Sequence, residues 1–116
     1  MDPQLIDVDA PTEVREFVRG RFELYRVGPM TLGRATYQPG WVWSEHVGAE
    51  AGDALCQVEH VGMVLSGEAV AAMDDGTEYR LRPGQFFYIP PGHDSWVVGD
   101  EPYVSLHFLG SEDYGT

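Results

Sequence analysis

The sequence predicts an all-β domain, and three observations support this fold class. Short runs rich in Val, Tyr, Phe and Trp recur along the chain, with Gly, Pro and Asp between them. The dipeptide Asp75-Gly76 separates two such runs and is typical of a tight hairpin, because the central residues of that turn need positive φ. The number and spacing of the runs indicate a β-sandwich or a β-barrel.

Only the beginning of the chain departs from this pattern. Residues 11–20 (PTEVREFVRG) predict a short N-terminal helix, because Val14, Phe17 and Val18 stand at helical spacing between a proline suited to a first turn and Gly20 as a stop signal. Everything after this segment is expected to be strand. The predicted strands cover residues 21–27, 31–37, 41–47, 57–65, 68–74, 77–82, 86–89, 95–98 and 103–109.

Turn residues separate these strands, and the composition allows one core. Pro83-Gly84 and Pro90-Pro91-Gly92 mark two sharp reversals, and residues 48–53 are expected to form a polar loop. With 116 residues, of which 43% are hydrophobic, the chain can bury one core but not two. We therefore expect a single domain over residues 1–116, with an N-terminal arm and helix over 1–20 and a barrel core over 30–110.

The charge balance excludes several classes of partner and chemistry. Nineteen Asp and Glu stand against seven Arg and no Lys, which gives a net charge of -12, so most of the surface would repel phosphate backbones and anionic membranes. We expect no nucleic-acid or membrane partner. Without lysine, no side chain can form a Schiff base. Cys56 is the only cysteine, which rules out an intramolecular disulfide, and the acidic first residues do not match a secretion signal, so we expect a cytoplasmic protein.

Two sequence blocks resemble the cupin superfamily, over about residues 30–110. The first runs from His60 to Glu68 (HVGMVLSGE) and is similar to the end of the first cupin motif. The second runs from Pro83 to His93 (PGQFFYIPPGH) and is similar to the second motif, in which a glycine turn, an aromatic strand and a proline-glycine corner aim the next side chains inward. The resemblance implies a double-stranded β-helix, or jelly roll, with one pocket inside it.

The resemblance also implies a metal site, whose usual cupin ligands are two histidines separated by one residue, then a glutamate, then a third histidine. In this sequence His60 stands where the glutamate is expected. Ser95 stands where the last histidine is expected, two residues after His93. Only His46 can supply a member of the histidine pair. The usual ligand set therefore cannot be transferred whole.

A different ligand set follows from the residues near the predicted pocket. His46, Cys56, His60 and His93 all fall in or beside segments that would line it. Side chains at positions 56 and 60 point the same way if that segment is extended, because strand side chains alternate with a period of two. Imidazole and thiolate together suit a divalent transition metal such as zinc, iron or nickel. Each of these residues alone would more often be structural, so a metal-free pocket stays an alternative.

Two further residues and one surface have structural explanations. His107 shares a face of its predicted strand with Ser105 and Leu109, and we favour a structural or surface role for it over a role as ligand or base. Asp94 would point away from His93 on a strand, so we expect its carboxylate to accept hydrogen bonds from the backbone of the corner. Both faces of the run MVLSGEAVAAM are apolar, which favours a homodimer in which a second subunit covers one face.

Three functions fit these residues. The first is a module that binds a small molecule, with one divalent metal in the pocket, and the small size and the lack of a recognisable catalytic dyad favour it. The second is a mononuclear metalloenzyme of oxygenase or isomerase type, with open metal positions for a substrate. The third is a metal-free cupin whose histidines hydrogen-bond within the core or to a ligand. The sequence alone does not specify the ligand, the metal or a reaction.

Overall fold

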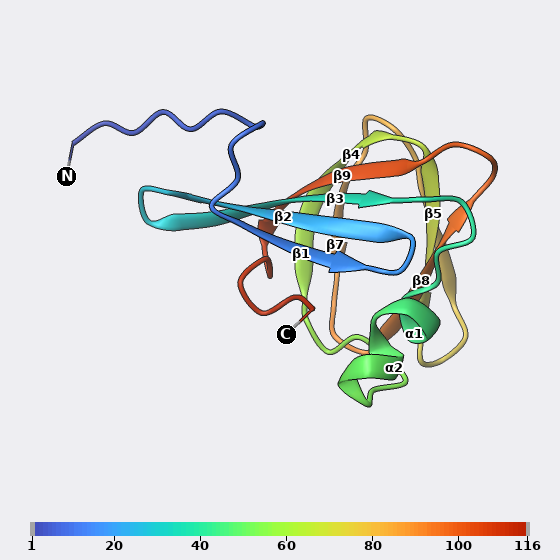
Figure 1. The fold of residues 1–116 in the computed structure, drawn as a ribbon. Coiled ribbons are helices and arrows are strands. Elements are labelled where there is room, and N and C mark those ends of the chain that lie inside the picture. The colour runs from blue at the N-terminus through green and yellow to red at the C-terminus, as the bar shows by residue number, and fades with distance from the viewer. Residues whose placement is uncertain (1, 116) are drawn as a thin grey trace.

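The computed structural model describes residues 2–115, and within them the chain forms nine strands and two short helices (Figure 1). A six-stranded sheet has the order β1-β2-β3-β9-β4-β7, and a three-stranded sheet has the order β6-β5-β8. No helix within this part of the chain is long and apolar enough to cross a membrane. The elements are β1 Glu13–Phe17, β2 Gly20–Val27, β3 Met30–Tyr37, α1 Trp43–His46, α2 Gly48–Ala51, β4 His60–Ser66, β5 Glu68–Met73, β6 Glu78–Leu81, β7 Phe86–Ile89, β8 His93–Val98 and β9 Tyr103–Leu109.

Residues from both sheets form one hydrophobic core. Leu24 of β2 and Val64 of β4 are fully buried, and Ala69 of β5 and Val97 of β8 belong to the same cluster. All pairings between neighbouring strands are antiparallel. Burial of these apolar side chains supplies the main driving force that holds the two sheets together. The architecture confirms the predicted all-β fold class.

The turns predicted from glycine are present. Gly76 has a φ of 88°, and it lies in the hairpin that joins β5 to β6. The Asp75 carboxylate accepts a hydrogen bond from the backbone N–H of Thr77 at 2.8 Å, which fixes the turn further. Gly84 and Gly92 have φ values of 85° and 92°, in the two corners predicted on either side of β7. The second of these corners sets the beginning of β8.

The helix predicted over residues 11–20 is wrong, because β1 occupies the middle half of that segment. β1 pairs with β2 in an antiparallel hairpin, and Val18, which a helix would have buried, is 62% exposed. Arg15 donates hydrogen bonds to the main-chain carbonyls of residues 111 and 112 at 3.3 and 3.0 Å, and Phe17 meets the ring of Tyr114 edge to face. Contacts with residues far along the chain therefore override the local helical spacing.

The strand predicted over residues 41–47 is also wrong, because α1 begins at Trp43. The backbone N–H of Val42 donates to Nδ1 of His46 at 2.9 Å. The Asp94 carboxylate, on β8, accepts from the backbone N–H and the hydroxyl of Ser44 at 2.9 and 2.8 Å. These two side chains satisfy N–H groups at the beginning of α1 that no helical carbonyl can reach. The predicted polar loop over 48–53 contains α2.

Candidate metal centre

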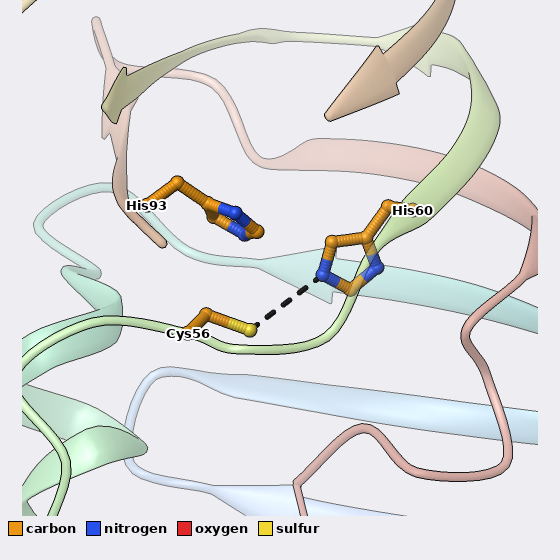
Figure 2. A group of neighbouring side chains, drawn as sticks. All are labelled: Cys56, His60 and His93. Atoms are coloured by element: carbon orange, nitrogen blue, oxygen red, sulfur yellow. Dashed lines mark hydrogen bonds between the residues drawn. The ribbon is translucent and has the colours of Figure 1, made fainter. Parts of the chain in front are cut away.

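Three potential metal donors meet inside the molecule, at the beginnings of β4 and β8. The donor atoms of Cys56, His60 and His93 all lie within 4.8 Å of one another, and all three residues are buried (Figure 2). Cys56 Sγ lies 3.7 Å from Nε2 of His60. The predicted orientation of positions 56 and 60 toward one side is thus confirmed by the distance between the two side chains.

Backbone hydrogen bonds hold Cys56 against the corner that precedes β8. Cys56 N–H donates to the carbonyl of His93 at 2.6 Å, and the N–H of Gly92 donates to the carbonyl of Cys56 at 2.8 Å. The positive φ of Gly92, 92°, lets the chain turn at this point. The proline-glycine corner thereby fixes the separation of two candidate ligands that are far apart in the sequence.

A further hydrogen bond orients the ring of His93. Its Nδ1 lies 2.8 Å from the carbonyl oxygen of Pro90, and because a carbonyl can only accept, Nδ1 carries the proton. Nε2 of His93 therefore keeps its lone pair for another partner. Histidine ligands of metals are commonly held in this way by a carbonyl on the second ring nitrogen.

Burial keeps both imidazoles neutral. It lowers the pKa of His60 to about 2, with smaller contributions from His107 and His93, and it also lowers the pKa of His93. Burial raises the pKa of the Cys56 thiol to about 11. At neutral pH the histidines can thus donate lone pairs to a metal directly, whereas Cys56 must lose its proton when a metal binds.

The separation of the Cys56 and His60 donor atoms fits a transition metal. Zinc–sulfur and zinc–nitrogen bond lengths at a tetrahedral angle place the two donor atoms about 3.6 Å apart. The separation of 3.7 Å between Cys56 Sγ and His60 Nε2 agrees with this value. In addition, Nδ1 of His60 is buried and has no hydrogen-bond partner among the described residues. A metal on Nε2 requires the tautomer in which Nδ1 carries the proton. Because Nδ1 accepts no hydrogen bond, it is free to carry that proton.

A small cavity adjoins two of the three donors, and its lining includes His60 and His93. It measures about 50 Å³, and its walls are mainly aromatic. Trp41 and Trp43 form part of the wall and are 2% and 5% exposed. Tyr37 stacks on Trp41 with 3.8 Å between ring centroids, and its hydroxyl lies 2.7 Å from that of Tyr114. No acidic side chain and no arginine lines the cavity in the part of the chain that the structure describes.

Sequence reasoning missed two residues of this cavity. His107 is buried, lines the cavity, and has its ring centroid 5.2 Å from that of His60. Its Nε2 lies 3.0 Å from the Ser105 hydroxyl, and Tyr103, Ser105 and His107 form the buried face of β9. The alternation of polar and apolar residues in this strand was a usable signal, but it did not decide which of the two faces points toward the cavity. Tyr114 follows the last strand and carries no motif that points to the cavity.

The fourth predicted ligand lies elsewhere. The structure does not bring His46 into the group of Cys56, His60 and His93. His46 is partly buried at the end of α1, where its Nδ1 accepts the hydrogen bond from Val42. The carboxylate of Asp94 accepts backbone N–H bonds, as expected, but from Ser44 and Ser95.

Solved structures with the same arrangement of strands have diverse descriptions. A protein of unknown function from Rhizobium leguminosarum is 20% identical, with a TM-score of 0.57, and the match covers 78% of this chain and 80% of that one. The oxalate decarboxylase of Lactobacillus farciminis, solved as a formate complex, is 18% identical with a TM-score of 0.63, over 85% of this chain and 31% of the enzyme. The capsular polysaccharide assembling protein of Staphylococcus aureus is 18% identical with a TM-score of 0.62, over 90% of this chain and 30% of that protein.

These comparisons establish the fold and the family. At such identities, structural similarity supports the fold alone, and the chain spans about a third of the length of the last two proteins. No curated protein matches the chain. The model of the cupin domain matches residues 33–108, which is more than half of the 116 residues, and the chain therefore belongs to the cupin family.

Proposed function

We propose that this cupin binds a small molecule in its central cavity and holds one divalent transition metal there through Cys56, His60 and His93. The convergence of three buried donor atoms within 4.8 Å carries the proposal. The thiolate and the two imidazoles suit zinc, iron or nickel. When bound, such a metal would act as a Lewis acid toward a ligand in the cavity. The chain's own residues supply an aromatic wall to the cavity, which His60 and His93 also line.

Elemental analysis of protein purified without a histidine tag tests the metal. We expect close to one metal per chain, and we expect His60→Ala and His93→Ala to lose it. His46→Gln is the matched control, because His46 lies outside the donor group and glutamine can still accept the hydrogen bond from Val42. A folded protein that takes up no added zinc, iron or nickel would instead support the metal-free alternative, in which the histidines serve the core or the ligand directly.

A mononuclear metalloenzyme is the second candidate, and one observation favours it. The donor group contains three residues, whereas a closed structural site usually has four, so a coordination position would stay open beside the cavity. The fold is shared with an oxalate decarboxylase. Oxygen uptake by the iron-loaded chain, in the presence of small metabolites, tests the oxygenase form of this proposal. Turnover that is absent from His60→Ala and retained by His46→Gln would support it.

We also propose that the chain forms a homodimer in the cytoplasm. β7 is an edge of the six-stranded sheet, and two of its aromatic side chains, Phe86 and Tyr88, are 74% and 57% exposed. Leu65 of β4 and Leu109 of β9 are also exposed, at 44% and 46%. Exposed apolar groups of this size are typical of interaction surfaces. Light scattering after size exclusion should give a dimer mass, and Phe86→Ser should shift it to the monomer.

A further inference from the structure

The three candidate ligands are closed off from solvent. Cys56, His60 and His93 are 2%, 5% and 4% exposed, so a hydrated cation has little access to their donor atoms. Part of the surrounding wall must therefore move to admit one. Most of the side chains that line the adjoining cavity belong to strands of the two sheets. Paired strands open only at a high cost in free energy, because their backbone hydrogen bonds break together.

One residue of the cavity wall comes from a segment that has no such pairing. Residues 111–115 follow β9 and fold back toward β1 without forming a strand or a helix (Figure 1). Among residues 2–115, the one backbone–backbone hydrogen bond of this segment runs from the N–H of Tyr114 to the carbonyl of Ser111, and it is long, at 3.4 Å. We call this segment the 111–115 turn.

The 111–115 turn places Tyr114 against the candidate centre. Tyr114 is 4% exposed, and its ring centroid lies 5.4 Å from that of His60 and 4.7 Å from that of Phe22. Its hydroxyl lies 2.7 Å from the hydroxyl of Tyr37. Tyr114 thus covers the side of the cavity on which His60 lies. Its withdrawal would uncover this ligand while the strands of both sheets stay paired.

One arginine holds the main chain of the turn in place. Nη1 of Arg15, on β1, donates hydrogen bonds to the carbonyls of Ser111 and Glu112 at 3.3 and 3.0 Å, and also to the carbonyl of Tyr114. Hydrogen bonds from a charged donor are stronger than those between neutral groups. Arg26 adds a contact to the Glu112 carboxylate at 2.8 Å, at the exposed edge. Because three carbonyls depend on the same guanidinium, loss of Arg15 would loosen the whole turn.

We propose that the 111–115 turn is a movable cover over the donor group, that Arg15 is its latch, and that a metal enters when the turn swings away from β1. Gly110 precedes the turn with a φ of 91°, and Gly115 closes it with a φ of 72°. Glycine leaves such a conformation for others at little cost, so both positions suit a hinge. The inference rests on the proposed metal site and adds the route by which that site fills.

The reactivity of the only cysteine measures the opening directly. Cys56 is unpaired with another cysteine and lies in the same buried cluster as Tyr114. The rate at which N-ethylmaleimide adds to the Cys56 thiol of the metal-free chain therefore reports how often the centre is uncovered. We expect Arg15→Gln to raise this rate about tenfold or more, because the carbonyls lose a charged donor. Arg15→Lys keeps such a donor and should raise the rate less.

Arg80→Gln is the matched control for these variants. Arg80 is exposed, and its guanidinium donates to the Glu68 carboxylate at 2.9 Å on the three-stranded sheet, so its loss should leave the labelling rate unchanged. α1 is the other segment that could open, since it carries Trp43 of the cavity wall and is held by the Asp94 carboxylate. Faster labelling in Asp94→Ala, with none in Arg15→Gln, would identify α1 as the cover and overturn the inference.

Urea distinguishes a local opening from unfolding of the whole chain. Withdrawal of five residues exposes little surface, so labelling through the open turn should depend only weakly on urea. Labelling through global unfolding would instead follow the full urea dependence of the unfolding equilibrium. A labelling rate in Arg15→Gln that follows global unfolding, or that equals the rate of the unaltered chain, would overturn the inference.

Zinc exchange separates the cover from the proposed metal site. A cover slows uptake and release by the same factor, so Arg15→Gln should speed the transfer of zinc to a chelator about tenfold and leave the Kd nearly unchanged. A tenfold loss of affinity with an unchanged uptake rate would show that Arg15 supports the ligands themselves, and would overturn the inference. A chain that takes up no zinc would contradict the metal site, whereas thiol labelling of the same chain would still decide whether the turn opens.

Discussion

Acidification should destabilise the metal-free protein, because its buried histidines stay neutral in the folded state and accept protons readily only when the chain unfolds. Burial lowers the pKa of His60 from 6.5 to about 2 and that of His107 from 6.5 to about 4. Between those values the unfolded chain binds more protons than the folded one, so the free energy of unfolding falls as the pH falls below 6.5. From pH 7 to pH 5 each histidine should remove about 2 kcal/mol, or roughly 4 kcal/mol together. His93, whose pKa is also lowered, adds to the loss.

Urea unfolding at pH 7, 6 and 5 in the presence of a chelator measures this effect. His107→Gln should remove about half of the pH dependence, since glutamine cannot be protonated in this range. Acidification also relieves charge repulsion within a chain of charge -12, and this stabilises the folded state. The effect is common to the wild-type protein and the variant, so the difference between the two proteins excludes it. A wild-type protein and a His107→Gln variant whose losses of unfolding free energy between pH 7 and pH 5 differ by less than about 1 kcal/mol would refute the reasoning.

Three other predictions concern single sites. Gly67→Ala should destabilise the fold by about 2 kcal/mol or more, measured by urea unfolding, because φ is 73° and the new Cβ would lie 2.2 Å from the carbonyl oxygen of Pro102. Asp94→Ala should cost about 1 to 2 kcal/mol and increase amide exchange in α1, because two hydrogen bonds to Ser44 are lost. Unchanged exchange there would contradict the role given to Asp94. Zinc at a hundred times its Kd should add about 2.7 kcal/mol to the free energy of unfolding, and Cys56→Ser should reduce this gain.

The sequence predicts best those features that short-range chemistry determines. The Asp75-Gly76 hairpin follows from the need for positive φ, and Gly76 has a φ of 88°. The same reasoning locates the corner before His93. The segment 11–20 was misjudged because its strand is fixed by Arg15 and Phe17 through contacts with the other end of the chain. No local pattern contains that information.

The candidate site shows the same division. Cys56, His60 and His93 were selected by residue type and by their place near two motifs, and the structure brings them together. His46 was selected on the same grounds, but its assignment depended on a strand that is in fact α1. Tyr114 reaches the cavity from beyond the last strand, where the sequence offers neither periodicity nor a motif. Long-range packing, which composition does not reveal, decides which of the candidates meet.

The proposed centre has the same net ligand charge as the ligand set that the resemblance to cupins implies. Its donor atoms are different. Three histidines and a glutamate carry one negative charge, and so do two histidines and a thiolate. The position of the glutamate is taken by His60, and the charge moves to Cys56, which lies 3.7 Å away. Sulfur is a softer donor than carboxylate oxygen, so this exchange strengthens the preference for softer metals such as zinc and iron. Because the thiol has a pKa of about 11, metal uptake must also release a proton, so affinity for zinc should rise with pH.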